Sequence, residues 1–256
     1  IREGFFLLKR IAEQRLSFLN KSHMELFYST SIQDDHFLLE GEEAHHLLKV
    51  LRHQQGDTVM ITDGLGTLYT TKISEANPKK CVLQIVKKEK NENPKNYSLH
   101  IAIAPTKNSD RLEWFLEKAT EIGIDEITPI VCQHSERRLI KEERLIKVLV
   151  SAMKQSLKSY LPLLHPLTKF DDFIQESREP QRYICTMDAD EMLHKRFDPS
   201  EKCLVLIGPE GDFSTEEVTL AKKHGFVPVS LGNSRLRTET AAVMVCATLS
   251  ASALPR

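Results

Sequence analysis

The sequence has neither a long apolar run nor a cysteine pattern that could cross-link a small fold. No apolar stretch approaches the roughly 20 residues that span a bilayer, so we expect no transmembrane segment. The five cysteines are scattered, odd in number and without a CxxC pair, which argues against both a disulfide framework and a zinc site. This cysteine usage is typical of a protein of the reducing cytoplasm.

The sequence also lacks an excess of charge of either sign, because 35 Lys and Arg residues are balanced by 36 Asp and Glu residues. Such a chain does not coat nucleic acid indiscriminately, so any affinity for RNA must come from local basic patches. No GxSxG nucleophile elbow occurs, which excludes a generic α/β-hydrolase. The 256 residues, 41% of them hydrophobic, suffice for one large or two small globular domains.

The first part of the chain, from Met24 to about Glu92, predicts a compact β-rich unit. Strands are predicted over 59–62, 67–73 and 81–86, and a short amphipathic helix over 42–53. The polar stretch 87–95 predicts a linker. We interpret the basic segment 1–23 as an upstream extension without a functional role.

From Tyr97 onward, predicted strands and helices alternate. Strands are predicted over 99–104, 125–131, 182–186, 204–207 and 226–231, and helices over 112–122, 140–160, 214–223 and after Thr238. Ser214 and Glu217 have capping-box spacing, which fixes the start of one helix. The alternation favours an α/β fold, a mostly parallel sheet with helices on both faces.

Two glycine loops follow predicted strands: Gly208-Pro209-Glu210-Gly211 and Leu231-Gly232-Asn233. A polar run, Arg237 to Thr240, then opens the last predicted helix. Each motif alone could be an ordinary turn or helix cap. Together they favour a site, because α/β proteins use such loops to wrap backbone amides around a small ligand. The first loop is neither a phosphate loop nor GxGxxG.

Residues 208–214 (GPEGDFS) and 231–241 (LGNSRLRTETA) resemble the C-terminal signature of the RsmE family of 16S ribosomal RNA uridine methyltransferases, in the SPOUT superfamily. The resemblance covers 24–251 and includes three further motifs: HHLLKVLR (45–52), EKATEIGIDEITPI (117–130) and SERR (135–138). It implies a trefoil-knotted parallel-sheet methyltransferase domain over 93–256 and a PUA-like RNA-binding β-barrel over 24–92. Asp212 stands where the family usually has glycine, and its side chain would narrow the loop or add negative charge.

The resemblance further implies S-adenosylmethionine as the cofactor, the N3 atom of a uridine in small-subunit ribosomal RNA as the acceptor, and a homodimer. The implied cofactor-binding residues are Ile207, Gly208, Gly211, Leu231, Gly232 and Leu236. Because N3 must lose a proton, we predict that Arg237 stabilises negative charge on the uracil and that Glu239 accepts the proton or orients the base. Glu239 could equally be an ordinary first-turn carboxylate.

RNA contacts are predicted mainly between Gln133 and Tyr160, where seven Lys and Arg residues outnumber three acids. The predicted contact residues are Arg52, Arg137, Arg138, Lys154 and Lys158. No metal is expected, because the adjacent His45 and His46 would point to different faces of a helix.

Two other functions stay open at this point. One is a different SPOUT reaction, such as methylation of a ribose 2′-hydroxyl, which mapping of the product nucleoside would distinguish. The other is a non-catalytic RNA-binding or ribosome-assembly protein, which a failure to bind the methyl donor would favour.

Overall fold

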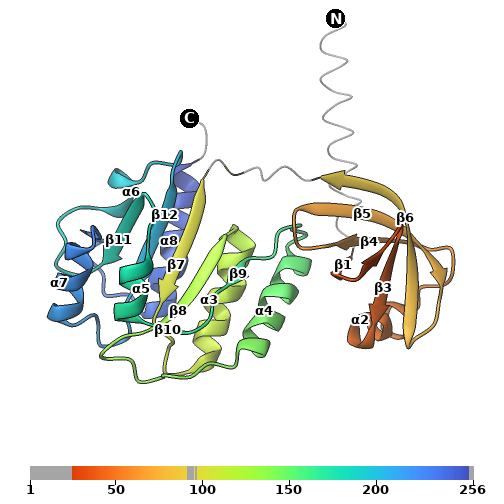
Figure 1. Cartoon of the computed structure of the whole chain (residues 1–256), viewed down its shortest axis with the longest axis horizontal. Coiled ribbons are helices and arrows are strands. Elements are labelled where there is room, and N and C mark those ends of the chain that lie inside the picture. The colour runs from red at the N-terminus through yellow and green to blue at the C-terminus, as the bar shows by residue number, and fades with distance from the viewer. Residues whose placement is uncertain (1–24, 91–94, 96, 254–256) are drawn as a thin grey trace, which may run out of the picture. The chain divides into compact units, whose positions relative to one another are not determined.

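The computed structural model describes residues 25–90, 95 and 97–253 (Figure 1). The chain divides into two compact units, Ile1–Asn91 and Glu92–Arg256. The predicted extension at 1–23 lies outside the described residues. Within the described part, no helix combines the length and the apolar character needed to cross a membrane.

The first unit is a curled six-stranded sheet with the order β1-β4-β5-β6-β3-β2. Its strands are β1 (Leu26–Tyr28), β2 (Ile32–Gln33), β3 (His36–Glu40), β4 (Thr58–Thr62), β5 (Thr67–Glu75) and β6 (Lys80–Lys90). Only β1 and β4 pair in parallel among these strands. Side chains alternate between buried and more exposed along β5, so one face of the sheet covers the core that contains Phe37, Ile61 and Leu83.

Two predictions for this unit need correction. The helix predicted over 42–53 is a short α-helix, α2 (Gly41–His45), that continues as a π-helical turn, η1 (His46–Val50). The linker predicted over 87–95 is wrong for its first four residues, because β6 runs on to Lys90 and pairs with β5. Polar composition suits this end of the strand, since Lys88 lies over the Tyr69 ring and Lys87 pairs with Glu89 on an exposed surface.

The second unit is a parallel sheet with the order β10-β8-β7-β12-β11-β13, and β9 pairs with β8. Its strands are β7 (Ser98–Ile103), β8 (Glu126–Val131), β9 (Leu163–Leu164), β10 (Thr168–Lys169), β11 (Gln181–Cys185), β12 (Lys202–Ile207) and β13 (Val227–Val229). Its helices are α3 (Ser109–Ile122), α4 (Glu142–Gln155), α5 (Phe170–Glu176), α6 (Leu193–Arg196), α7 (Thr215–Lys223) and α8 (Thr238–Ser252). The α/β fold class is therefore confirmed, whereas the trefoil knot stays a prediction of the resemblance.

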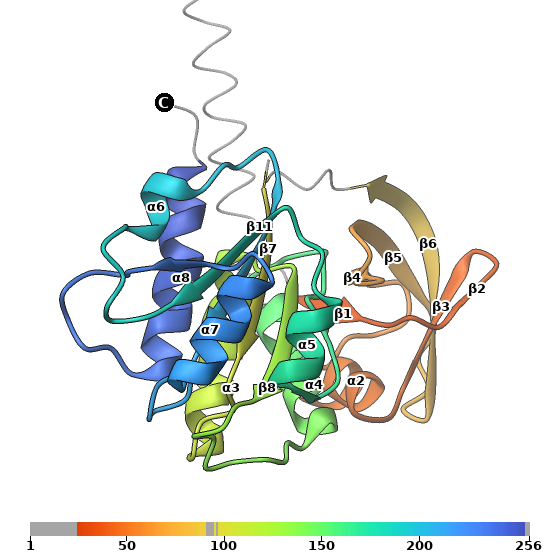
Figure 2. The ribbon, with the colours of Figure 1, turned by 60° about the vertical axis from the view of Figure 1, so that its left-hand side comes forward.

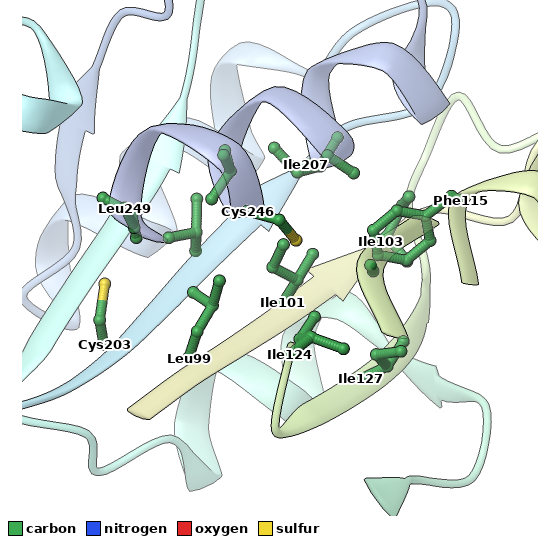
Figure 3. Close-up of a cluster of buried hydrophobic side chains, with 14 of the residues drawn as sticks. Leu99, Ile101, Ile103, Phe115, Ile124, Ile127, Cys203, Ile207, Cys246 and Leu249 are labelled. Carbon is green, nitrogen blue, oxygen red and sulfur yellow. The ribbon is translucent and has the colours of Figure 1, made fainter. Parts of the chain in front are cut away.

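Both faces of this sheet are buried, as expected for parallel strands. On one face, Leu99, Ile101 and Ile103 of β7 pack in the same cluster as residues of α3, α4 and α8, and Figure 3 shows them beside Phe115 and Leu249. The opposite face is covered by α5 and α7 (Figure 2). Burial of each such large apolar side chain stabilises the fold by about 1.5–3 kcal/mol.

The start of α7 is set by a motif that the sequence predicts, whereas the end of α4 is set by a motif that the sequence does not reveal. The predicted capping box is confirmed: the Ser214 hydroxyl accepts a hydrogen bond from the Glu217 amide, and the Glu217 carboxylate accepts one from the Ser214 amide. Helix α4 is shorter than the predicted 140–160, because Leu157 adopts a left-handed conformation (φ 53°) and the Lys158 amide bonds back to the Met153 carbonyl. Glycine usually occupies the left-handed position of this C-terminal motif, so a leucine at that position does not indicate the end of a helix in the sequence.

Candidate active site

A cavity of about 590 Å³ lies at the carboxyl ends of β11, β12 and β13. This volume is in the range of small-molecule sites, and ligands of open α/β sheets bind at this edge. Loops after all three strands contribute to its wall. The lining residues are Cys185, Thr186, Met187, Ile207, Gly208, Pro209, Glu210, Asp212, Ser230, Leu231, Gly232, Ser234, Arg235, Leu236, Arg237, Thr238 and Ala241.

The loop after β12 is fixed from two sides. The Glu210 carboxylate accepts a hydrogen bond from the Lys107 amide at 3.0 Å, which ties the loop to the connection between β7 and α3. The Thr238 hydroxyl donates to the Gly208 carbonyl at 3.1 Å, which ties it to the start of α8. The cavity wall is therefore held in place by contacts between segments far apart in the sequence.

The loop after β13 is anchored by Ser230. Its amide donates to the Glu191 carbonyl at 2.7 Å, its carbonyl accepts from the Leu193 amide at 3.1 Å, and its hydroxyl accepts from the Gly232 amide at 3.1 Å. Gly232 has φ 120°, which side-chain-bearing residues rarely adopt, and no atom lies within 4 Å of the position that a Cβ would take. Glycine at this position keeps that space of the cavity wall open.

The third loop, after β11, was not predicted as part of the site. Thr186 and Met187 of this loop line the cavity together with Cys185, the last residue of β11. Burial raises the pKa of the Cys185 thiol, so this group is a neutral part of the wall rather than a thiolate nucleophile. The sequence that follows β11 contains no glycine, and only the position of β11 beside β12 and β13 could have indicated this loop.

Most of the predicted cofactor-binding residues meet in this cavity. Five of the six line it: Ile207, Gly208, Leu231, Gly232 and Leu236. Gly211 does not line it. A Cβ on Gly211 would lie 3.2 Å from the Cβ of His134, so the glycine there permits close packing against the neighbouring loop.

Asp212 adopts a left-handed backbone conformation with φ 63°, which costs a non-glycine residue about 1–3 kcal/mol. Its Oδ1 atom accepts a hydrogen bond from the Phe213 amide at 2.8 Å, and its carbonyl oxygen lies 3.0 Å from His134 Nδ1. The side chain thus caps its own loop. It contributes to the wall of the cavity, whose volume with the aspartate side chain in place is about 590 Å³.

The two predicted catalytic residues lie in different environments. Arg237 is exposed and lines the cavity at the start of α8, where the first-turn amides and the helix dipole favour negative charge. Glu239 is buried and does not line the cavity. One of its oxygens lies 3.8 Å from Arg111 Nε of α3, and the other has no hydrogen-bond partner among the described residues.

The predicted RNA contacts belong to both units and have different surroundings. Arg137 donates to the carbonyls of Thr106 and Lys107, so it supports the same loop that Glu210 holds. Arg138 is exposed and donates to the Gln133 carbonyl. Lys154 of α4 and Lys158 are half-buried, and burial together with nearby Lys95 lowers the pKa of Lys158. Arg52 belongs to the first unit and adopts φ 61°.

The chain matches the RNA methyltransferase domain over residues 92–250 and the RNA methyltransferase PUA domain over residues 39–86. It is 30% identical over 225 residues to the ribosomal RNA small subunit methyltransferase E of Synechocystis, covering 83% of this chain and 72% of that protein. This chain belongs to the ribosomal RNA small subunit methyltransferase E family. The Bacillus subtilis member is 27% identical, covering 84% of this chain and 89% of its own.

Solved structures agree with this membership. A probable rRNA methyltransferase from Porphyromonas gingivalis is 43% identical, with a TM-score of 0.82 and coverage of 89% of this chain and 99% of that one. A Legionella pneumophila methyltransferase, solved with bound S-adenosylmethionine, is 27% identical with a TM-score of 0.81, covering 90% and 98%. The predicted family and the two kinds of fold, a PUA unit and a parallel-sheet methyltransferase unit, are thereby confirmed.

Proposed function

We propose that this protein transfers the methyl group of S-adenosylmethionine to the N3 atom of a uridine in 16S ribosomal RNA of the small subunit. The observation that carries the proposal is the cavity of about 590 Å³ with Arg237 in its wall, in a chain of the methyltransferase E family. The names of its relatives support the small-subunit RNA as substrate. The Legionella complex supports the cofactor.

The residues of the cavity suit this cofactor. Ile207, Leu231 and Leu236 offer apolar surface for an adenine ring, and the backbone around Gly208 and Gly232 offers amides and carbonyls for its polar edge. The sulfonium supplies the activated methyl group, so the protein has mainly to position the two reactants and exclude water.

Arg237 is the proposed catalytic residue. For transfer, the N3 proton passes to water, N3 forms a bond to the methyl carbon, and the electron pair of the broken carbon–sulfur bond stays on sulfur. The Arg237 guanidinium stabilises the negative charge that deprotonation places on the uracil oxygens. We assign buried Glu239 a positioning role through Arg111, because its carboxylate lies outside the cavity wall. Acceptance of the N3 proton by Glu239 would require its side chain to move.

Helix α8 supports a homodimer. Over its 15 residues, the only charged side chain is that of Glu239, which is buried. Its exposed residues are Thr240, Met244, Ala247, Ala251 and Ser252, none of them charged, and Met244 is the large apolar side chain among them. We therefore propose that α8 packs against a second copy of this chain. In sedimentation experiments, Met244→Glu should shift the protein toward monomer.

The decisive test is incubation of undermethylated small subunits with labelled S-adenosylmethionine, followed by nucleoside analysis. The proposal predicts N3-methyluridine. A labelled 2′-O-methyl nucleoside would instead assign the other SPOUT reaction, and absence of cofactor binding by calorimetry would favour a non-catalytic RNA-binding protein.

The role of Arg237 is tested by Arg237→Ala. The loss of one charge-stabilising donor should lower kcat about 100–1,000-fold, while the affinity for the cofactor stays within about threefold. Lys195→Ala on the exposed surface of α6 is the control and should turn over normally. Normal turnover of the arginine variant would remove Arg237 from the mechanism.

A further inference from the structure

A second cluster of polar side chains lies at the opposite, amino-terminal edge of the sheet in the methyltransferase unit. His100 of β7, Glu126 of β8 and His165, which follows β9, bring one ligand atom each within 4.8 Å of one another. They line a cavity of about 550 Å³ that shares no lining residue with the cofactor cavity. Nothing in the proposed methyl transfer uses these side chains.

The side chains of this cluster are oriented by further polar groups. The buried His100 ring lies 3.0 Å from Glu179 through Nδ1 and 2.7 Å from the Thr128 hydroxyl through Nε2. Nε2 of His165 lies 2.8 Å from Glu126 Oε2, and the rings of His100 and His165 are 5.2 Å apart. A histidine whose second nitrogen is held by a carboxylate is the usual arrangement around a bound metal.

The charges around the cavity favour a cation. Its wall carries three carboxylates, Glu126, Glu176 and Glu179, against Arg178 and Lys202, which leaves one negative charge when the imidazoles are neutral. The Lys202 ammonium lies 2.6 Å from Glu126 Oε1 and neutralises part of this charge.

We propose that His100, Glu126 and His165 form a binding site for a divalent transition metal, with zinc as the best match. Two imidazoles and one carboxylate are a donor set that zinc accepts, with a fourth position left for water. Tetrahedral zinc, with bonds of about 2.0–2.1 Å, places its ligands about 3.4 Å apart. A bound metal would replace one of the two hydrogen bonds of His100 and the one between His165 and Glu126. The half-exposed His165 lies in the loop between β9 and β10 and can adjust its position by side-chain rotation.

Lys202 makes this proposal sharply testable, because its ammonium and a metal ion would neutralise the same Glu126 carboxylate. Its side chain is 37% exposed and can swing into solvent when a metal binds. If the cluster is only a network of ion pairs, Lys202 stabilises it. If the cluster binds a metal, the positive charge of Lys202 lowers the affinity for that metal. The two interpretations therefore predict opposite effects of removing this cation.

The experiment titrates Co²⁺ and Zn²⁺ into the full-length protein after treatment with EDTA. We expect one bound ion per chain, the visible absorption of tetrahedral cobalt, and a melting temperature that rises with zinc. His165→Ala and Glu126→Gln should lose the absorption, and His194→Ala, which changes an exposed histidine of α6, should retain it. Lys202→Met should bind zinc about tenfold more tightly, because a nearby positive charge is removed.

The proposal is overturned if cobalt gives no tetrahedral spectrum, if His165→Ala binds as the wild-type chain does, or if Lys202→Met binds zinc no more tightly. Circular dichroism of each variant identifies unfolding, and Glu126→Gln keeps the side-chain volume. These readouts do not involve methyl transfer, so they succeed or fail independently of the proposed function. The site was not predicted from the sequence, which led us to expect no metal.

Discussion

The two edges of the parallel sheet are built in different ways. At the carboxyl edge, the cofactor cavity is walled by residues of the loops that follow three strands, with glycines at Gly208 and Gly232. At the amino edge, the cluster of His100, Glu126 and His165 is made by ionisable side chains on or beside the strands themselves. The same seven-stranded sheet thus presents a cavity built by loops at one end and a cluster of strand side chains at the other.

The difference follows from what each position can offer. Chain leaving the carboxyl ends of parallel strands is irregular, so its amides and carbonyls are free to bind a ligand. Residues at the amino ends of the strands are already paired in the sheet, for example His100 with Glu126 and Leu204, and they contribute side chains only. We therefore expect substitutions at the two edges to have separable effects.

The largest effect on cofactor binding is expected for Gly232→Val. A β-branched residue cannot adopt φ 120° without strain of about 1–3 kcal/mol, and its side chain enters the cavity. We expect the affinity for S-adenosylmethionine to fall about 100-fold by calorimetry, which corresponds to about 2.7 kcal/mol. Gly56→Val, at an exposed turn of the first unit with φ 94°, is the matched control for strain alone and should bind the cofactor normally.

At the amino edge we expect a smaller effect, which lowers the stability of the fold and leaves cofactor binding unchanged. Glu179→Gln replaces the charged partner of His100 by a neutral amide of similar shape, so the chain loses a charge-assisted hydrogen bond worth about 1.5–3 kcal/mol. Urea unfolding in EDTA should show this loss of stability, while cofactor affinity stays unchanged. A large loss of cofactor binding in this variant would mean that the two edges are coupled.

The smallest effect is expected for Asp212→Gly. Glycine relieves the left-handed strain at this position, but the hydrogen bond from the Phe213 amide to the Asp212 side chain is lost. Because these two contributions oppose each other, the free energy of unfolding should change by less than about 1 kcal/mol. Cofactor affinity should stay within about threefold of the wild type. A tenfold gain in affinity would indicate that the Asp212 side chain obstructs the cavity.

The carboxyl edge could be predicted from the sequence because its signals are local. A glycine loop directly after an apolar strand marks Gly208 and Gly232, and the polar run marks Arg237. The loop after β11 carries no such mark, and its place in the cavity depends on the order of the strands. The burial of Glu239 beside Arg111 could not be predicted either, because it depends on how α8 packs against α3.

The amino edge could not be predicted, because its residues are far apart in the sequence. His100 and Glu179 are separated by 79 positions, and Glu126 and Lys202 by 76. Most strands and helices of the second unit were predictable from apolar periodicity. The short helices α5 and α6 and the two-residue strands β9 and β10 were missed, because segments of that length hold too few residues to establish a period.

Amide hydrogen exchange of the full chain with and without S-adenosylmethionine tests directly whether the cavity at the carboxyl edge binds the cofactor. We predict that added protection is confined to the three loops of the carboxyl edge, around Thr186, Gly208 and Gly232, and to the first turn of α8. Unchanged exchange in those loops, or protection centred on His100 and His165 instead, would show that the cofactor does not bind in this cavity.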